Sequence, residues 1–482
     1  MKDFIEQYLN RNSTSYFISE LSQYSFKKML EIAKRHGENL KIELPQKAKC
    51  AVLCNREINA AIAILSGWLA DLVVIPVSKK YGMKHCEKIL GFVEPDIIIT
   101  DEEISREVFL CQYNIVNEEF SCKNNTFHMH EPILKDAAVI MCTSGTTGIP
   151  KGVVLSAEGL KKNADNILKY FPLKNQDRIL IARPLYHCAV LTGEFLVSII
   201  KGCNIYFFEN QYNPFMLLRR IIEEKINVMC GTPTLMKQLS TICEKHNQKN
   251  VLDLIAISGE VLTKWVAEDI NKTFNLAKIF NVYGLTEAGP RVSYLPCVLF
   301  EKIPESVGIP LEEVEIRVVN DIESMLEKSV NETGYIIVKS PSVMKGYYRD
   351  DKLSDRVLKK GWLNTGDLGY KDKDGRLYIV SRADDMIIKA GLNIYPAEIE
   401  NSLLANKAIN QVVAYGIKEN FGWSIGIDVV LEKDYFYFTK KDIMAICRNS
   451  LPEYQIPNII NVVDELIRNA SGKLIRRRNN IG

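Results

Sequence analysis

The sequence has no apolar run long enough to cross a membrane. Its most apolar stretch, residues 60–72, is interrupted by Ser66, Gly67 and Asp71, and a spanning helix needs roughly 20 apolar residues. The first residues mix both charges and lack the apolar segment of a secretory signal peptide. These features exclude a membrane-spanning or secreted class and predict a cytoplasmic protein.

The chain also lacks an excess of charge and a cysteine framework. Lys and Arg number 61 against 59 Asp and Glu, a net charge of +2, so nothing in the global charge favours nucleic acid as a partner. The twelve cysteines are scattered without a CxxC pair, which predicts reduced thiols. His128 and His130 have no third ligand nearby in the sequence, so no metal site is expected there.

The length and the hydrophobic pattern predict several domains with an α/β fold. A chain of 482 residues exceeds what one hydrophobic core normally supports. Up to about residue 291, short β-branched runs alternate with amphipathic stretches, which is typical of parallel sheets covered by helices. Strands are expected at 50–54, 73–77, 96–100, 138–141, 178–182, 204–208, 228–230, 253–258 and 278–281, and helices at 57–69, 157–170, 216–225 and 234–245.

Beyond residue 291 the pattern changes twice. Alternating segments at 314–319 and 335–339, set among frequent glycines, predict a small antiparallel, barrel-like module over 291–383. From residue 384 an α+β unit follows, with helices expected at 397–404 and 440–450 and strands at 411–417 and 425–431. We therefore predict an N-terminal domain, 1–383, and a C-terminal domain, 384–482.

A run of small and hydroxylated residues follows the apolar segment 137–140. Backbone N–H groups, hydroxyls and one lysine, with few bulky side chains, suit the binding of a polyphosphate. Gly152 rather than Ser or Thr follows Lys151, so this is not the P-loop of the common NTPases. The phosphate-binding candidates are Thr143, Ser144, Gly145, Thr146, Thr147, Gly148 and Lys151.

Two further motifs offer chemistry suited to a nucleotide. In the segment 281–287, the glycine after Tyr283 leaves a flat ring open to a purine, while Thr286 and Glu287 supply a hydroxyl and a hard carboxylate for phosphate and Mg²⁺. Asp367 lies on a glycine turn, where its carboxylate can accept both hydrogen bonds of a ribose diol. Each motif alone occurs more often as ordinary structure, so their combination carries the prediction.

In this order the motifs closely resemble those of the acyl-adenylate-forming superfamily. That group includes acyl- and aryl-CoA ligases, luciferases and peptide-synthetase adenylation domains. The resemblance runs from about residue 137 to 476 and rests on TSGTTGIPKG, YGLTE, TGD with a later RAD, PLYH and a closing GKLIR. It implies ATP and Mg²⁺ as cofactors, a large N-terminal domain and a small mobile C-terminal domain.

The resemblance implies individual roles for the nucleotide-binding residues. Tyr283 would stack on adenine, Thr286 would contact the α-phosphate and Glu287 would hold the metal. Asp367 would bind the ribose, with Arg382 in support. The remaining ATP-binding candidates are Ser258, Gly259, Glu260 and Ile379.

The C-terminal residues receive their roles from the same resemblance. Lys473 corresponds to the catalytic lysine that reaches the cleft during adenylation, although this chain has Asn-Ala-Ser before the Gly-Lys pair where many members carry a Pro and a Thr. Asp384 matches the hinge about which the C-terminal domain rotates, and Lys389 and Gly391 match the thiol channel. The basic tail 476–478 is expected to be solvated.

The segment 184–187 resembles the acyl- and aryl-CoA ligases, in which the histidine corresponding to His187 lies beside the acyl carboxylate. Amino-acid-activating domains typically carry an aspartate there, so an α-amino acid substrate is disfavoured. Ser258, Gly259 and Glu260 instead resemble the adenylation-domain version of the adenine loop, so the subfamily signal is mixed. Residues 187–194, 230–236, 258 and 282–285 are expected to form the acid pocket.

The resemblance therefore implies ATP-dependent activation of a small carboxylic acid to an acyl-adenylate, followed by transfer to a thiol. Coenzyme A is the first choice of acceptor, which would make the chain an acid–CoA ligase. One alternative is the phosphopantetheine arm of an acyl or peptidyl carrier protein. Another is a non-catalytic binding protein on the same fold. Aliphatic, aryl and hydroxy acids all remain open.

Overall fold

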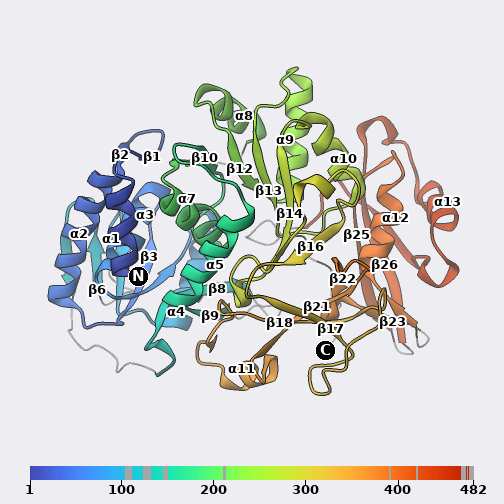
Figure 1. Cartoon of the computed structure of the whole chain (residues 1–482). Helices are drawn as coiled ribbons and strands as arrows, with labels where there is room; N and C mark the ends of the chain where they lie inside the picture. The colour runs from blue at the N-terminus through green and yellow to red at the C-terminus, as the bar shows by residue number, and fades with distance from the viewer. Residues whose placement is uncertain are drawn as a thin grey trace. The chain divides into compact units, whose positions relative to one another are not determined.

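The computed structural model describes residues 1–103, 111–122, 132–144, 150–209, 213–389, 392–419 and 422–467, together with Leu474 and Arg476. Figure 1 follows the chain through these elements. The chain forms two compact units. The first contains Met1–Leu262, Val266–Ile316 and Val338–Leu363, and the second contains Thr263–Trp265, Arg317–Ile337 and the chain from Asn364 onward. The predicted functional boundary between residues 383 and 384 stays a prediction.

One sheet of the first unit carries the hairpin that was predicted to bind phosphate. Its strand order is β19-β9-β8-β4-β3-β5-β6-β7, with β3, β4, β5, β6 and β8 parallel and β7, β9 and β19 antiparallel to their neighbours. Its strands are β3 (Lys49–Leu53), β4 (Val73–Pro76), β5 (Ile97–Thr100), β6 (Cys111–Asn114), β7 (Glu119–Cys122), β8 (Ala137–Ser144), β9 (Pro150–Ser156) and β19 (Gly346–Tyr347). Strands β3, β4 and β5 are buried along their whole length, as expected for strands covered on both faces.

The second sheet of this unit carries most of the other predicted site residues. Within the unit its strand order is β16-β15-β14-β13-β12-β10-β11-β1-β2, and the strands from β14 to β1 are parallel. These strands are β1 (Tyr16–Ile18), β2 (Gln23–Ser25), β10 (Arg178–Ile181), β11 (Asn204–Phe207), β12 (Val228–Gly231), β13 (Leu254–Ile257), β14 (Lys278–Tyr283), β15 (Ser293–Tyr294) and β16 (Ser306–Pro310).

Helices connect the parallel strands, and their polar caps set where several of them begin. Ser156, Asn213 and Thr232 accept hydrogen bonds from backbone N–H groups in the first turns of α5, α8 and α9, which satisfies donors that the helix leaves unpaired. The helices of this unit are α1 (Lys2–Arg11), α2 (Phe26–Glu43), α3 (Glu57–Leu69), α4 (Met83–Val93), α5 (Ala157–Tyr170), α6 (Cys188–Val190), α7 (Val197–Lys201), α8 (Pro214–Glu223), α9 (Pro233–Lys245), α10 (Lys264–Thr273) and α11 (Asp351–Val357).

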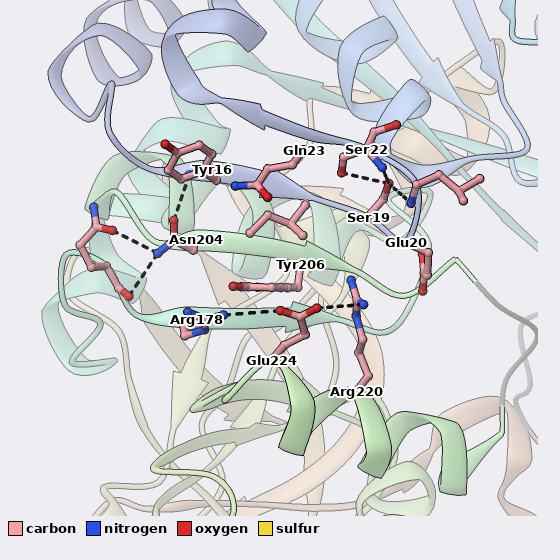
Figure 2. A pocket seen from close by; sticks show the side chains of 13 residues that line it. Tyr16, Ser19, Glu20, Ser22, Gln23, Arg178, Asn204, Tyr206, Arg220 and Glu224 are labelled. Carbon is pink, nitrogen blue, oxygen red and sulfur yellow. Dashed lines mark hydrogen bonds and ion pairs between the residues drawn. The ribbon is translucent and has the colours of Figure 1, made fainter.

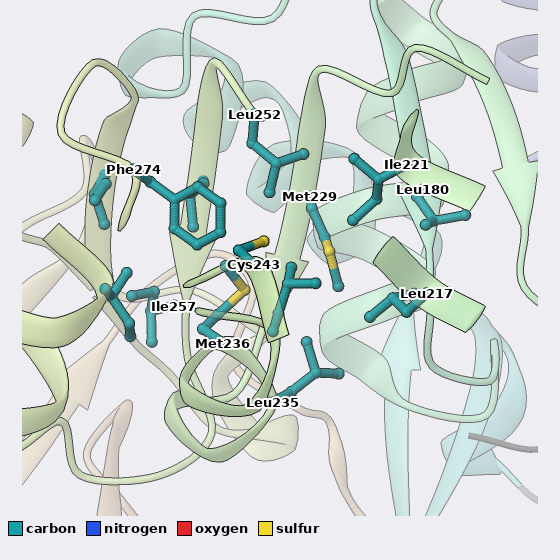
Figure 3. Close-up of a cluster of buried hydrophobic side chains, with 14 of the residues drawn as sticks. Leu180, Leu217, Ile221, Met229, Leu235, Met236, Cys243, Leu252, Ile257 and Phe274 are labelled. Atoms are coloured by element: carbon teal, nitrogen blue, oxygen red, sulfur yellow. The ribbon is translucent and has the colours of Figure 1, made fainter. Parts of the chain in front are cut away.

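A large apolar cluster holds α8 and α9 against the second sheet. Figure 3 shows Leu217 from α8 and Met236 from α9 near Met229 of β12. All three side chains are fully buried. Burying a side chain of this size stabilises the fold by roughly 1.5–3 kcal/mol. The cluster therefore fixes the strand ends from which the site residues extend.

The second unit is β-rich and then α+β. Strands β17 (Glu315–Val319), β18 (Gly334–Lys339), β21 (Trp362–Lys371) and β22 (Leu377–Arg382) follow one another in order, whereas the short strand β20 (Leu358–Lys359) belongs to the first unit. Further along are the strands β23 (Ile387–Lys389), β24 (Leu392–Ile394), β25 (Ile409–Glu419), β26 (Gly422–Leu431) and β27 (Ile459–Val462), and the helices α12 (Pro396–Leu404) and α13 (Lys440–Ser450). The predicted α/β fold class is confirmed.

Two expectations from the sequence were wrong. Reduced thiols were expected, but Cys111 on β6 is disulfide-bonded. In the β6–β7 hairpin Cys111 lies opposite Cys122, and the spacing of the cysteines in the sequence does not reveal that pairing. The expected solvated tail 476–478 is wrong at Arg476, because its guanidinium donates to both carboxylate oxygens of Glu400 at 2.8 and 2.7 Å; residues 477 and 478 lie outside the described residues. Within the described part of the chain, no helix is both long and apolar enough to span a bilayer.

Candidate active site

Three of the phosphate-loop candidates, Thr143, Ser144 and Lys151, lie on the β8–β9 hairpin of the first sheet. The register pairs Thr143 on β8 with Lys151 on β9 across the ladder, so the hydroxyl-bearing residue and the cation face each other at the base of the hairpin. Gly152, next to Lys151, is closely packed, because a Cβ there would lie 3.0 Å from the Ile140 and Tyr348 side chains. The predicted loop residues Gly145, Thr146, Thr147 and Gly148 lie outside the described residues.

The second motif forms a turn at the carboxyl end of β14. Tyr283 is the last residue of β14, and Thr286 and Glu287 begin a short 3₁₀ turn (Thr286–Ala288). Gly284 allows this turn, because a Cβ at that position would lie 2.1 Å from the carbonyl oxygen of Pro290. Gly284, which was expected to leave the Tyr283 ring accessible to a purine, is therefore also needed for the backbone to pack.

Tyr347 on β19 connects these two motifs. Its hydroxyl donates to Oε1 of Glu287 at 2.9 Å, and its ring centroid lies 5.7 Å from Nζ of Lys151. The backbone N–H of Met344 also donates to the Glu287 carbonyl at 2.8 Å. A single buried side chain therefore contacts both the cation of one motif and the carboxylate of the other.

The donor set suits a magnesium ion bound together with phosphate. In the described residues no group of three or more His, Cys, Asp or Glu side chains could hold a metal alone. Mg²⁺ is usually held by one or two carboxylates, with phosphates and water completing the shell. Glu287 is half-buried and provides one such oxygen ligand, so the residues fit a metal that arrives with its nucleotide.

His187 lies in a loop that two buried hydrogen bonds fix in place. Oε2 of Glu57 accepts from the backbone N–H of Leu185 at 3.1 Å, and the Tyr186 hydroxyl donates to the carbonyl of Cys142 at 2.7 Å. The second bond ties the loop to β8, directly before Thr143. Burial, and then Arg183, lower the pKa of His187 to about 3, so the imidazole is neutral at physiological pH.

The adenine-loop candidates lie after β13 and have mixed roles. Ser258 is buried, and its Oγ makes no hydrogen bond within the described structure. Gly259 has a φ of +94°, which favours glycine. Oε2 of Glu260 accepts from both the backbone N–H and the hydroxyl of Thr234 at the start of α9. Glu260 therefore has a structural contact beside its predicted nucleotide role.

The predicted ribose pair forms in the second unit. Asp367 on β21 and Arg382 on β22 are directly opposite in the ladder, and Nη1 of Arg382 donates to Oδ1 of Asp367 at 2.8 Å and to the Thr365 carbonyl at 2.9 Å. Gly366 has a φ of +72°, and a Cβ there would lie 2.8 Å from Nη2 of Arg382. Ile379 lies on the same strand as Arg382.

The other C-terminal candidates are placed only in part. Asp384 lies in a short 3₁₀ turn (Ala383–Asp385), and Nζ of Lys389 on β23 donates to Oδ1 of Asn458 at 3.5 Å. Gly391 and the predicted catalytic Lys473 lie outside the described residues, as do His128 and His130. The roles proposed for these residues stay predictions.

Sequence reasoning missed Tyr347 and the buried supports of the His187 loop. No local pattern identifies Tyr347, because its significance comes from pairing with β9, which is distant in the sequence. A separate hollow of about 650 Å³ opens where β1, β2, β10 and β11 meet α8, and Figure 2 shows Arg178 and Arg220 there on either side of Glu224. The residues that line it include none of the predicted site residues.

The fold and the arrangement of these motifs define a class of nucleotide-dependent ligases, and comparison with known proteins agrees. The AMP-binding enzyme family matches residues 4–348, and the AMP-binding enzyme C-terminal domain matches residues 398–473. The chain therefore belongs to the AMP-binding enzyme family. This confirms the predicted superfamily and the prediction of an AMP-forming acid–thiol ligase.

Its relatives are acid–CoA ligases. A 2-succinylbenzoate–CoA ligase of Oceanobacillus iheyensis is 30% identical over 409 residues, covering 84% of this chain and 82% of that protein. A long-chain-fatty-acid–CoA ligase of Escherichia coli is 31% identical over 353 residues, covering 72% of this chain and 62% of that protein.

Solved structures of related enzymes share the whole fold. The o-succinylbenzoate CoA synthetase of Bacillus subtilis, in complex with its acyl-adenylate intermediate, has a TM-score of 0.86 at 26% identity and covers 100% of this chain and 98% of that one. The same enzyme with ATP and a magnesium ion has a TM-score of 0.85 at 26% identity, covering 99% of this chain and 98% of that one.

Proposed function

We propose that this chain activates a small carboxylic acid with ATP and transfers the acyl group to coenzyme A. The observation that carries the proposal is that Tyr347 contacts both Lys151 and Glu287. A cation and a carboxylate held by one side chain suit a polyphosphate and its metal. Two comparisons support this proposal. A similar solved structure holds ATP and a magnesium ion, and the relatives are CoA ligases.

In the first half-reaction a carboxylate oxygen attacks the α-phosphorus of ATP. The bond to the β-phosphate oxygen breaks, and pyrophosphate leaves with the bonding electrons. Lys151 and Thr143 would hold the β- and γ-phosphates, and Glu287 would hold Mg²⁺, which when bound screens the negative charge of the phosphates. Such catalysis depends on positioning and on charge stabilisation rather than on covalent chemistry.

His187 would act as a neutral neighbour of the reacting carboxylate. With a pKa lowered to about 3, the imidazole carries no charge near neutral pH and can donate one N–H to an oxygen. It neither neutralises the nucleophile nor competes for the α-phosphate. Thr286, at the turn beside Glu287, would contact the α-phosphate.

In the second half-reaction a thiol sulfur attacks the acyl carbonyl carbon. The C–O bond to the phosphate breaks, and AMP leaves with the bonding electrons, while the thiol proton passes to solvent. Asp384 would serve as the hinge between the domains 1–383 and 384–482, and Lys389 and Gly391 would line the thiol channel. ATP and coenzyme A are intracellular compounds, so we place the activity in the cytoplasm.

Acid-dependent exchange of pyrophosphate into ATP, followed by mass spectrometry with and without coenzyme A, tests the proposal. Appearance of an acyl-CoA supports it in full. Accumulation of acyl-AMP without conversion would contradict the acceptor and point to a carrier protein. Absence of exchange with every acid would contradict the enzymatic function and favour a binding protein.

The Lys473→Ala variant separates the two half-reactions. A strong transition-state contact contributes roughly 100-fold or more to the rate, so adenylation should slow by that factor. Thioester formation from preformed acyl-AMP should change little. An equal loss in both half-reactions would contradict the role assigned to Lys473.

A further inference from the structure

The turn that carries His187 has a buried backbone donor that the turn itself does not pair. The carbonyl of Pro184 accepts from the N–H of His187 at 3.1 Å, which closes a four-residue turn. That bond does not use the N–H of Leu185, the second residue of the turn, and Leu185 is buried. A buried N–H without an acceptor is costly. The Leu185 N–H therefore needs an acceptor from another part of the chain.

Glu57, the first residue of α3, supplies that acceptor. Its Oε2 accepts from the Leu185 N–H at 3.1 Å, and its Oε1 pairs with Nζ of Lys80 at 3.8 Å. The Glu57 side chain is only 9% exposed. Burial raises the pKa of its carboxyl, although Lys80 and the Leu185 N–H oppose that change. A carboxylate buried in this way is more typical of a functional group than of ordinary packing.

Helix α3 is fixed to the first sheet, whereas the His187 turn belongs to the second. The helix connects β3 to β4, and most of its residues are buried. Near its C-terminal end, Nε1 of Trp68 donates to the carbonyl of Ala138 on β8 at 2.9 Å. The turn instead follows β10 of the second sheet. Glu57 therefore joins the sheet that carries the phosphate hairpin to the turn that carries His187.

Tyr186 forms a second connection between the same two parts. Its hydroxyl donates to the carbonyl of Cys142 on β8 at 2.7 Å, one residue before Thr143. The cavity beside this contact, which Glu57, Leu185 and Tyr186 help to line, measures only about 10 Å³, roughly the room that one water needs. Two direct contacts thus hold the turn against the first sheet, with little space for it to shift.

Adenylation requires the acid and the nucleotide to be aligned. In the proposed function the acid carboxylate lies beside His187, whereas Thr143 and Lys151 of the first sheet hold the β- and γ-phosphates. In-line attack needs the reacting atoms roughly 3–3.5 Å apart, and a misplacement of about 1 Å can slow the reaction on the order of 100-fold. The position of the His187 turn relative to the phosphate hairpin should therefore control this step.

We propose that Glu57 is a positioning residue for adenylation, which places His187 relative to the phosphate hairpin by binding the Leu185 N–H. The inference rests on the proposed function and adds a residue to that same site. In this role Glu57 acts through the turn rather than on the acid or the nucleotide. Its effect should be specific to adenylation. In preformed acyl-AMP a covalent bond already joins the acyl group to the phosphate, so thioester formation does not depend on this alignment.

Two replacements of Glu57 separate the hydrogen bond from the volume of the side chain. Glu57→Met keeps an unbranched side chain but removes the acceptor, so kcat for acid-dependent pyrophosphate exchange should fall on the order of 100-fold. Glu57→Gln keeps an oxygen that can accept the same N–H, so its kcat should stay within roughly tenfold of the wild type. In both variants the KM for MgATP and the rate of thioester formation from preformed acyl-AMP should change little.

Glu209→Met is the matched control, because Glu209 also binds the start of α3. Its carboxylate accepts from Nε of Arg56 and from the N–H of Ile58, both at 3.2 Å. These bonds lie outside the His187 turn, so Glu209→Met should lower the free energy of unfolding and leave kcat for adenylation as in the wild type. If it loses as much kcat as Glu57→Met, general loosening of α3 explains the effect and the proposal is wrong.

The half-reactions decide between positioning and a merely structural role. An equal loss in both half-reactions of Glu57→Met, or a wild-type kcat in that variant, would overturn the proposal while leaving the ligase function intact. No exchange in the wild type with any acid would overturn both. If Glu57→Met does not fold, Glu57→Asp decides. It keeps the charge but is one CH₂ shorter, so adenylation alone should slow roughly tenfold or more; unchanged adenylation would refute the proposal.

Discussion

Removing the Tyr347 hydroxyl tests how the site is assembled. Tyr347→Phe deletes the 2.9 Å bond to Glu287 but keeps the ring that lies over Lys151. A hydrogen bond to a charged group contributes roughly 1.5–3 kcal/mol. Glu287 is only half-buried, so we take the lower end, about 1.5 kcal/mol, which corresponds to about a tenfold change in rate.

The assay is pyrophosphate exchange measured against Mg²⁺ and ATP concentration. We expect kcat/KM for MgATP to fall about tenfold in Tyr347→Phe. Tyr347→Leu also removes the ring over Lys151, which adds roughly 0.5–1 kcal/mol and a further loss of a few-fold. In a Glu287→Gln background, the hydroxyl deletion should have a much smaller effect, because the two residues act as a pair.

The neighbouring tyrosine is a matched control. The Tyr348 hydroxyl accepts from Nζ of the buried Lys49 at 3.0 Å, so Tyr348→Phe should lower the free energy of unfolding without changing the Mg²⁺ dependence. The reasoning is refuted if Tyr347→Phe retains wild-type kcat/KM, or if its loss is equally large in the Glu287→Gln background.

Three further predictions concern the histidine, a glycine and the C-terminal ion pair. Burial lowers the pKa of His187 to about 3 in the folded state, from about 6.5 in the unfolded chain. Unfolding therefore takes up a proton below about pH 6.5, and the free energy of unfolding should fall as the pH drops below that value. Urea unfolding at pH 7 and pH 5 should show a smaller fall in His187→Asn. Gly366→Ala places a Cβ at a φ of +72° and 2.8 Å from Nη2 of Arg382. The free energy of unfolding should therefore fall by about 1–3 kcal/mol, and the KM for ATP should rise. Unchanged values of both would contradict the ribose assignment. Arg476→Ala removes the ion pair of Glu400, whose half-buried carboxylate keeps, among the described residues, only the N–H of Ala414, so urea unfolding should show a loss of about 1–3 kcal/mol that a Glu400→Gln change partly restores.

Local chemistry made much of the fold predictable. The bounds of α3, α5 and α13 match the expected helices 57–69, 157–170 and 440–450. The sequence of each shows amphipathic or apolar periodicity with a clear end. Helix α8 begins at Pro214 rather than at the expected residue 216, because Asn213 caps it and proline suits the first helical position.

The geometry of one residue pair was predictable from a motif. The Thr-Gly-Asp turn and the later Arg-x-Asp, through their resemblance to the superfamily, indicated Asp367 and Arg382, and the structure pairs the two side chains; their role in binding ribose stays a prediction. Tyr347 was missed, because it has no distinctive neighbourhood in the sequence. Its significance comes from strand pairing, which only the folded chain reveals.

The two-residue strand β19 also determines when the protein becomes competent during its synthesis. Both the β8–β9 hairpin and the turn after β14 leave the ribosome before Tyr347. Tyr347 pairs with Val153 of β9, a residue far from it in the sequence. Contacts between distant positions form late because their loops must close first. A nascent chain that ends before β19 should therefore contain both motifs without the side chain that contacts them both. Such an unfinished chain should bind ATP more weakly than the complete protein.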